Sequence, residues 1–118
     1  MKVLQISTVC GSGSVGRITV DIYHTLKSCG DEGLIAYGRR QAPEGVEAFR
    51  FGSDLDMGFH VLSTFFRGEH GFASTGQTRK LIEKIREWDP DVIHLHNIHG
   101  FILQVEELFS YLKQAGKP

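Results

Sequence analysis

Three glycines near the start of the chain, Gly11, Gly13 and Gly16, stand where a strand-like segment gives way to a helix-like one. Glycine lets the main chain approach a ligand closely, and the first amides of a helix have no partner within that helix. These amides lie at the positive end of the helix dipole and bind anions. The spacing predicts a phosphate or diphosphate site, although it also fits a tight β-α turn that needs glycine only for its conformation.

Two polar residues extend the predicted anion site. Ser14 has the residue type of a helix N-cap, and Arg17 follows in the first helical turn. A cation is unfavourable there by about 0.3–1 kcal/mol unless an anion binds beside it, so a bound phosphate and a solvated arginine are both compatible with Arg17. No Lys-Ser or Lys-Thr pair follows Gly16, which excludes the P-loop of nucleotide triphosphatases.

A second group of polar residues comprises His94, His96, Asn97 and His99, followed by Gly100. His94 and His96 are two residues apart, so within a strand they project to the same face. The later residues fall where the strand gives way to a loop, at the edge where open α/β sheets bind ligands. Neutral imidazole can donate a hydrogen bond to a hydroxyl or a phosphate and can exchange a proton.

This histidine cluster has three interpretations: acid-base and substrate contacts, core histidines with one in a loop, or a metal site. A metal favours a carboxylate or thiolate companion, and none is evident beside the histidines. We therefore favour the first interpretation, with His96 and His99 as catalytic residues and Asn97 and Gly100 as substrate-binding residues.

The elements that position these residues follow from the spacing of apolar side chains. Apolar segments predict strands at residues 1–7, 34–37, 46–51 and 91–96, and helical spacing predicts helices at 14–29, 81–88 and 102–115. Strands that alternate with helices are typical of parallel βαβ units. We expect an α/β fold, a Rossmann-like three-layer sandwich with a mostly parallel sheet.

Local signals refine these elements. Gly30 and Gly116 are expected to end the first and last helices, and Asp89-Pro90 to end the middle one. The first helix is expected to bury one apolar face, made of Val15, Ile18, Ile22, Leu26 and Cys29.

The glycine- and aromatic-rich stretch at 52–76 predicts a loop. Its aromatic part, Phe59 to Phe72, is expected either to pack over the core or to contact a membrane surface or an apolar acceptor. The next parallel strand is expected after Gly116. The sequence therefore predicts an incomplete domain, whose exposed sheet edge pairs two copies.

Composition limits the function further. The 118 residues suit one domain, and a net charge of −1 gives no basic surface for nucleic acid. Cys10 and Cys29 occur without a secretory signal, which favours a reduced, cytoplasmic protein. No apolar run approaches the roughly 20 residues that span a bilayer.

With both motifs placed, the chain resembles the N-terminal half of a retaining GT-B glycosyltransferase of the group 1, or family 4, kind. The resemblance covers all 118 residues. It rests on residues 1–17, which end in the glycine loop, and on Asp89-Pro-Asp-Val-Ile-His-Leu-His96 with Asn97-Ile-His-Gly100, the more specific of the two. Bacterial enzymes of capsule, exopolysaccharide or O-antigen synthesis are the most similar.

The resemblance implies a hexosyltransferase that moves sugar from a UDP- or GDP-sugar donor to a glycan or lipid-linked acceptor. The donor would lie between two Rossmann-like domains, with the acceptor on the N-terminal one and paired glutamates on a second domain. Residues 1–118 would then be the acceptor-side domain, inactive alone and without a metal cofactor. It would act in the cytoplasm, with peripheral contact at the inner face of the plasma membrane as a further option.

Two other functions stay open. An NADP-binding oxidoreductase would use the same glycine loop, with Arg39 and Arg40 taking the place of the ribose-binding acid that is missing after the second strand. A non-catalytic α/β module that mediates association is the third option.

Overall fold

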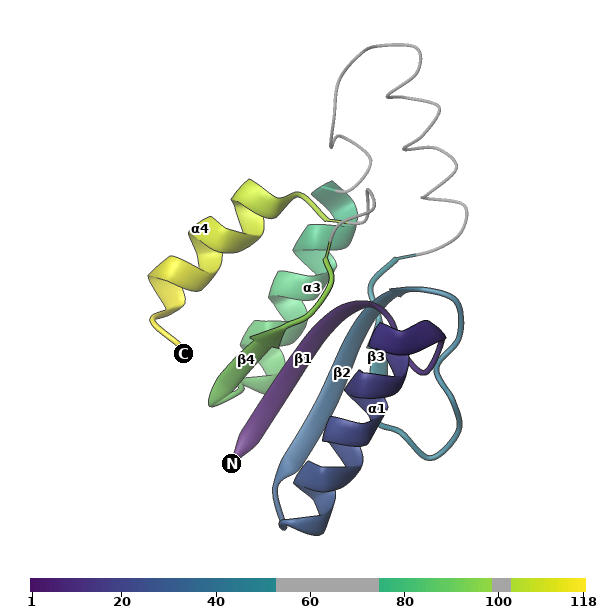
Figure 1. Ribbon diagram of the computed structural model, residues 1–118. Helices are drawn as coiled ribbons and strands as arrows, with labels where there is room; N and C mark the ends of the chain where they lie inside the picture. The colour runs from purple at the N-terminus through teal and green to yellow at the C-terminus, as the bar shows by residue number, and fades with distance from the viewer. Residues whose placement is uncertain (53–74, 99–102) are drawn as a thin grey trace, which may run out of the picture.

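The computed structural model describes residues 1–52, 75–98 and 103–118 (Figure 1). Its elements, in chain order, are β1 (Lys2–Val9), α1 (Gly13–Ser28), β2 (Glu32–Arg39), β3 (Ala48–Arg50), α3 (Thr75–Trp88), β4 (Val92–Leu95) and α4 (Val105–Ala115). Strands and helices alternate along most of the chain, as the apolar spacing predicts.

The strands form one four-stranded sheet in the order β3-β2-β1-β4, and every pairing is parallel. β1 and β2 are central and almost continuously buried. Since all strands run the same way, their carboxyl ends lie together at one edge of the sheet, which we call the carboxyl edge. The N-terminus of α1 lies at this edge (Figure 1).

Helices cover both faces of the sheet, with α1 on one side and α3 and α4 on the other (Figure 1). The larger core lies between the sheet and the α3–α4 layer. Its buried members are Leu4, Ile6, Leu34, Ala36, Phe51, Leu81, Ile82, Ile85, Leu103 and Leu108. A smaller core under α1 contains Cys10, Tyr23, Ile35 and Tyr37. The predicted three-layer α/β fold with a parallel sheet is confirmed.

The face that α1 buries differs from the predicted one. Its buried residues are Gly16, Thr19 and Tyr23, whereas Ile18 is 50% exposed and Cys29 is exposed. Small residues let the helix axis approach the sheet, and a β-carbon on Gly33 of β2 would lie 3.0 Å from the Tyr23 ring. The apolar spacing therefore did not identify the buried face of α1, because small side chains and one aromatic ring make the closest contact between this helix and the sheet.

Two predicted strands also differ in detail. Only Ala48–Arg50 of the predicted 46–51 segment forms a strand. β4 was expected to be buried, but His94 is exposed and its neighbours are half-buried. Within the described residues β4 is an edge strand, with α4 near one face and no helix over the other, which accounts for its exposure.

The C-terminal ends of the helices agree with the sequence, whereas their starts differ: α3 begins at Thr75, within the predicted 52–76 loop and ahead of the predicted start at residue 81, and α1 begins at Gly13. Gly30 and Gly116 have positive φ values of 83° and 63°, as left-handed residues after a helix do. Asp89, before Pro90, also has positive φ, and its amide bonds to the Ile85 carbonyl at 2.9 Å. The predicted cap Ser14 lies inside α1, because the helix begins one residue earlier and Ser12 is the extended N-cap.

The aromatic segment from Phe59 to Phe72, and with it the proposed membrane contact, lies outside the described residues. Among the described residues, no helix combines the length and the apolar character that crossing a bilayer requires.

Candidate functional site

A hollow of about 270 Å³ lies at the carboxyl edge, between the end of β1, the start of α1 and the end of β2. Its lining residues are Thr8, Val9, Ser12, Gly13, Arg39 and Arg40. Residues of the glycine loop and two arginines thus line the same space. Amides and guanidiniums are both donors without acceptor capacity, so the hollow suits an anion.

The three glycines of the loop have different structural roles. Gly11, at φ 76°, has no room for a side chain, because a β-carbon there would lie 2.7 Å from Pro43. A β-carbon on Gly16 would lie 2.9 Å from the Gly11 nitrogen, and the Gly11 amide donates to the Gly16 carbonyl at 2.8 Å. Gly13, at φ 65°, meets nothing within 4 Å and lines the hollow. Of the three predicted ligand-binding glycines, Gly13 faces the hollow and the other two shape the loop behind it.

The start of α1 borders the hollow and has no side-chain cap among the described residues. The Ser12 side chain makes no capping hydrogen bond, although Ser12 is the N-cap residue. The first amides of a helix have no intrahelical acceptor, so they are available to a ligand. Ser14 and Arg17 are exposed in the first turns of α1 and do not line the hollow.

Arg39 and Arg40 are the residues that the structure adds to the favoured phosphate site. The sequence indicated them only for the alternative NADP site. The Arg39 Nε atom is buried and has no hydrogen-bond partner within the part of the chain that the structure describes. Arg40 has φ 64°, which is uncommon and strained for a side chain of this size. Both features are typical of a site that a ligand completes.

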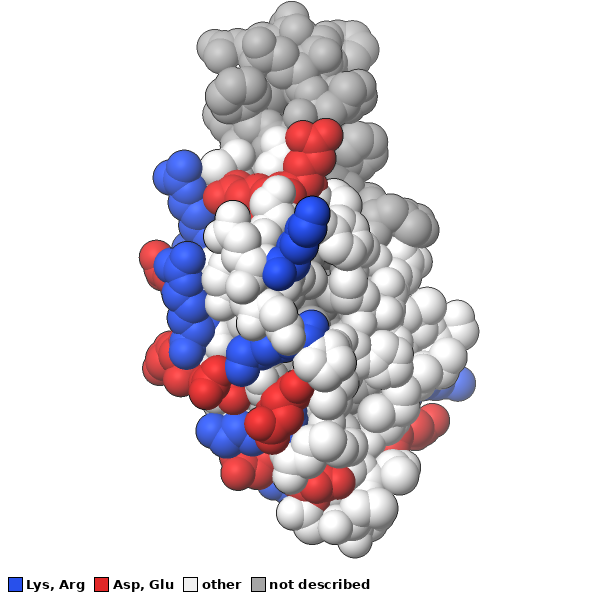
Figure 2. All heavy atoms as spheres, turned by 90° about the vertical axis from the view of Figure 1, so that its left-hand side faces the viewer, with Lys and Arg blue, Asp and Glu red and all other residues white. Residues whose placement is uncertain are grey.

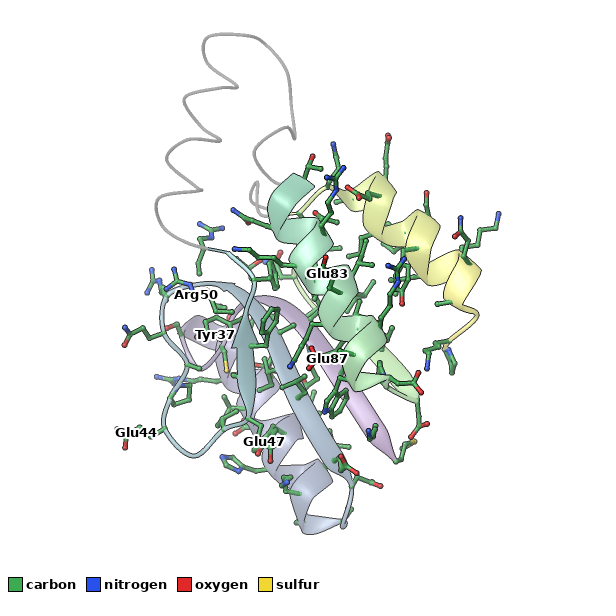
Figure 3. All side chains as sticks on the ribbon, turned by 180° about the vertical axis from the view of Figure 1, so that it is seen from behind. Tyr37, Glu44, Glu47, Arg50, Glu83 and Glu87 are labelled. Atoms are coloured by element: carbon green, nitrogen blue, oxygen red, sulfur yellow. The ribbon has the colours of Figure 1, made fainter. Side chains whose placement is uncertain are left out.

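Charge is distributed unevenly around the carboxyl edge. Arg50 ends β3 in register with Tyr37 of β2, and Figure 3 shows it toward the carboxyl edge. The acidic Glu44 and Glu47 belong to the loop from β2 to β3 and lie farther from that edge than Arg50 in Figure 3. Arg39, Arg40 and Arg50 therefore all lie toward the edge that holds the hollow.

Thr8 joins the second predicted cluster to this hollow. Its amide and its Oγ1 both donate to the carbonyl of Asn97, at 2.8 and 2.6 Å. The His96 amide donates to the Ile6 carbonyl of β1 at 2.9 Å. The structure thus brings Asn97 next to Thr8, one of the residues that line the hollow, and His96 next to Ile6 of the same strand.

The two strand histidines stack on each other. The rings of His94 and His96 lie 4.1 Å apart between centroids, at an interplanar angle of 28°, which confirms that they share a face. His96 is half-buried, and its Nε2 lies 2.9 Å from Gln5 Oε1. Burial, and after it the charge of His94, lowers the pKa of His96, so the ring is neutral near pH 7.

Two predicted residues, His99 and Gly100, lie outside the described residues. Residues 1–52, 75–98 and 103–118 contain no group of three or more His, Cys, Asp or Glu placed to hold a metal ion. Gln5 and Thr8 were not predicted, yet the signal was present, since they are polar residues within an apolar strand.

The fold and the site define a parallel-sheet α/β protein with a hollow at the carboxyl edge, lined by the start of α1 and by two arginines. Comparisons with protein-family models, curated proteins and solved structures find no match.

Proposed function

We propose that this chain is the acceptor-side domain of a retaining glycosyltransferase, and that its hollow binds the diphosphate of a nucleotide-sugar donor. One observation carries the proposal: the start of α1, Arg39 and Arg40 face one hollow that Thr8 ties to the His96–Asn97 segment. An activated sugar needs both parts, because its phosphates require cationic or amide donors and its sugar requires neutral polar groups.

The proposed roles follow from the chemistry of each side chain. The amides at the start of α1 and the two arginines hold the phosphate charge that develops on the leaving group. His96, which is neutral and directly precedes the Asn97 that bonds to Thr8, contacts the sugar or the acceptor, and Asn97 belongs to the same subsite. His99 and Gly100 are proposed members by resemblance alone. A UDP- or GDP-sugar is the proposed donor, and a glycan or lipid-linked molecule the proposed acceptor.

The proposed reaction is hexosyl transfer that also requires a second domain with the paired glutamates. We therefore expect the 118-residue chain to bind nucleotides weakly and to show no turnover. The free thiols of Cys10 and Cys29 are compatible with the proposed cytoplasmic location.

Calorimetric titration with UDP and GDP tests the phosphate site. Arg39→Ala and Arg40→Gly should each weaken binding about tenfold or more, because hydrogen bonds to charged groups contribute about 1.5–3 kcal/mol. Arg40→Gly should not lower the free energy of unfolding, since glycine accepts φ 64° without strain. Lys113→Ala, an exposed change on α4, is the matched control for loss of a cation. Unchanged affinity in both arginine variants would remove the proposed site.

An NADP-binding oxidoreductase is the second candidate. It is favoured by the position of Arg39 and Arg40 directly after β2, where dinucleotide-binding folds place the group that contacts the ribose or its phosphate. The same titration separates the two. Binding of NADP more tightly than of NAD, UDP and GDP, with loss of that preference in Arg39→Ala, would favour the oxidoreductase.

A further inference from the structure

A chain of hydrogen bonds runs from the glycine loop to the stacked histidines. The Gly16 carbonyl accepts from the Gly11 amide at 2.8 Å and from Thr19 Oγ1 at 2.7 Å. The Thr19 carbonyl accepts from Gln5 Nε2 at 3.0 Å, and Gln5 Oε1 lies 2.9 Å from His96 Nε2. Gln5 and Thr19 are fully buried. The glutamine side chain is therefore the link between α1 and His96.

The orientation of the Gln5 amide follows from its partners. A backbone carbonyl can only accept, so the group that faces Thr19 must be the NH2 of Gln5. The reverse orientation would place two oxygen atoms together at 3.0 Å, in a buried position where no donor would separate them. The carbonyl oxygen of Gln5 consequently faces the histidine.

This orientation determines the tautomer of His96. Gln5 Oε1 only accepts, so the contact at 2.9 Å requires a proton on His96 Nε2. In a neutral ring the other nitrogen, Nδ1, then carries the lone pair. Within the described residues, no hydrogen-bond partner lies at Nδ1.

We propose that Gln5 is a positioning residue, which holds neutral His96 with its proton on Nε2 and leaves Nδ1 as the acceptor for a ligand. An acceptor nitrogen binds a hydroxyl or amine of the ligand and repels an unprotonated phosphate oxygen. The phosphate groups then belong at the hollow, and the hydroxyl groups at His96. The tautomer is a property of the free protein; only the use of Nδ1 by a sugar rests on the proposed function.

The neutral state of the ring has a separate cause. Among the described residues, the titratable group that faces His96 is His94, whose ring stacks on it at 4.1 Å, and burial of His96 opposes a charge as well. Gln5 is uncharged, so it determines which ring nitrogen carries the proton. It supplies no negative charge that would stabilise a second proton on the ring. A glutamate at this position would do both.

The tautomer can be read directly from imidazole nitrogen and proton correlations in the ¹⁵N-labelled 118-residue chain, with His96 assigned by the loss of its signals in His96→Gln. The parent protein should show a protonated Nε2 and an unprotonated Nδ1. Gln5→Met removes the acceptor, so both tautomers should become populated. Gln5→Glu keeps an acceptor and adds a negative charge, so it should preserve the tautomer and raise the pKa of His96 by about one to three pH units.

Matched controls are Gln114→Met and Gln114→Glu, which make the same changes at an exposed position on α4 and should alter neither property. A proton on Nδ1 in the parent protein would overturn the proposal. So would a tautomer and pKa that do not respond in either Gln5 variant. If Gln5→Met fails to fold, the tautomer seen in the parent spectrum and the response of Gln5→Glu still test the proposal. Nucleotide titration is a separate readout, so a fixed tautomer without nucleotide binding would count against the proposed function alone.

Discussion

At the scale of single residues, the site depends on polar groups placed in unusual surroundings. Arg40 has a left-handed backbone, Arg39 has a buried Nε without a partner among the described residues, and His96 is half-buried against a second ring. Each arrangement costs folding free energy in the absence of a ligand. Their proximity to one edge is the reason to assign the function there.

The lowered pKa of His96 makes stability depend on pH. Above the ordinary value of 6.5 the ring is neutral in both the folded and the unfolded chain. Below it the unfolded chain takes up a proton first, so the free energy of unfolding should fall as the pH decreases from about 7 to about 5. Urea denaturation across this range measures the slope.

Substitution should separate this contribution from that of other histidines. His96→Gln should flatten the slope, whereas the control His24→Gln, at an exposed position on α1, should leave it unchanged. A slope in His96→Gln equal to that of the parent protein would contradict the assignment.

At the scale of elements, the close contact between the glycine loop and α1 positions the site. Gly16 lies on the buried face of α1, against the backbone of Gly11. This contact brings the start of the helix to the end of β1, where Ser12 and Gly13 line the hollow.

Gly16→Ala should disturb both folding and binding. The new β-carbon would lie 2.9 Å from the Gly11 nitrogen and 3.1 Å from its carbonyl carbon, so backbone must move. We expect a loss of about 1–3 kcal/mol in unfolding free energy, typical of overpacking, together with weaker nucleotide binding. Denaturation and titration of the same sample measure both effects.

Gly76→Ala is the matched control. Gly76 lies in α3, and a β-carbon there meets no atom of the described residues within 4 Å. Because alanine is favoured over glycine in helices, stability should rise by about 0.5–1 kcal/mol with unchanged binding. Equal effects of the two substitutions would show that the Gly16 contact is unimportant.

Much of this architecture could be predicted from the sequence. The alternation of apolar segments predicted the layers of the α/β fold, and the glycine and histidine motifs indicated two parts of the candidate site. The buried face of α1 could not be predicted, because Gly16 and Thr19 make their contact by being small rather than apolar. Neither could the pairing of Gln5 with His96, since it joins a residue of β1 to the residue that directly follows β4, and the two are distant in sequence.

At the scale of the whole molecule, one side of the sheet is incompletely covered. β4 is an edge strand among the described residues, and beside it lies a groove of about 360 Å³ whose apolar lining includes Ile93, Leu95 and Leu112. Phe109, from α4, also lines it and is 48% exposed. In Figure 2, which faces this side, charged residues gather toward one flank and a broad uncharged area fills the other.

This surface should make two copies of the chain associate. An edge strand with apolar neighbours pairs readily with another chain. We expect sedimentation velocity to show a fraction of dimer that increases with protein concentration. Phe109→Glu should lower this fraction, because it places a charge in the groove. Ser110→Glu adds the same charge at the next exposed position of α4 and should have little effect. A monomer at every concentration would contradict this prediction.

Both chain ends meet the sheet far from the hollow. The Met1 ammonium pairs with Asp31 ahead of β2, and the Pro118 carbonyl accepts from the Ile93 amide near the start of β4 (Figure 1). The eight residues of β1 separate Met1 from the carboxyl edge by roughly 25 Å, and Ile93, the partner of Pro118, is in register with Leu4 in the first half of that strand. A fluorophore or a surface tether attached at either terminus would therefore leave ligand access unobstructed, which makes immobilised or labelled protein a sound format for weak-affinity screening.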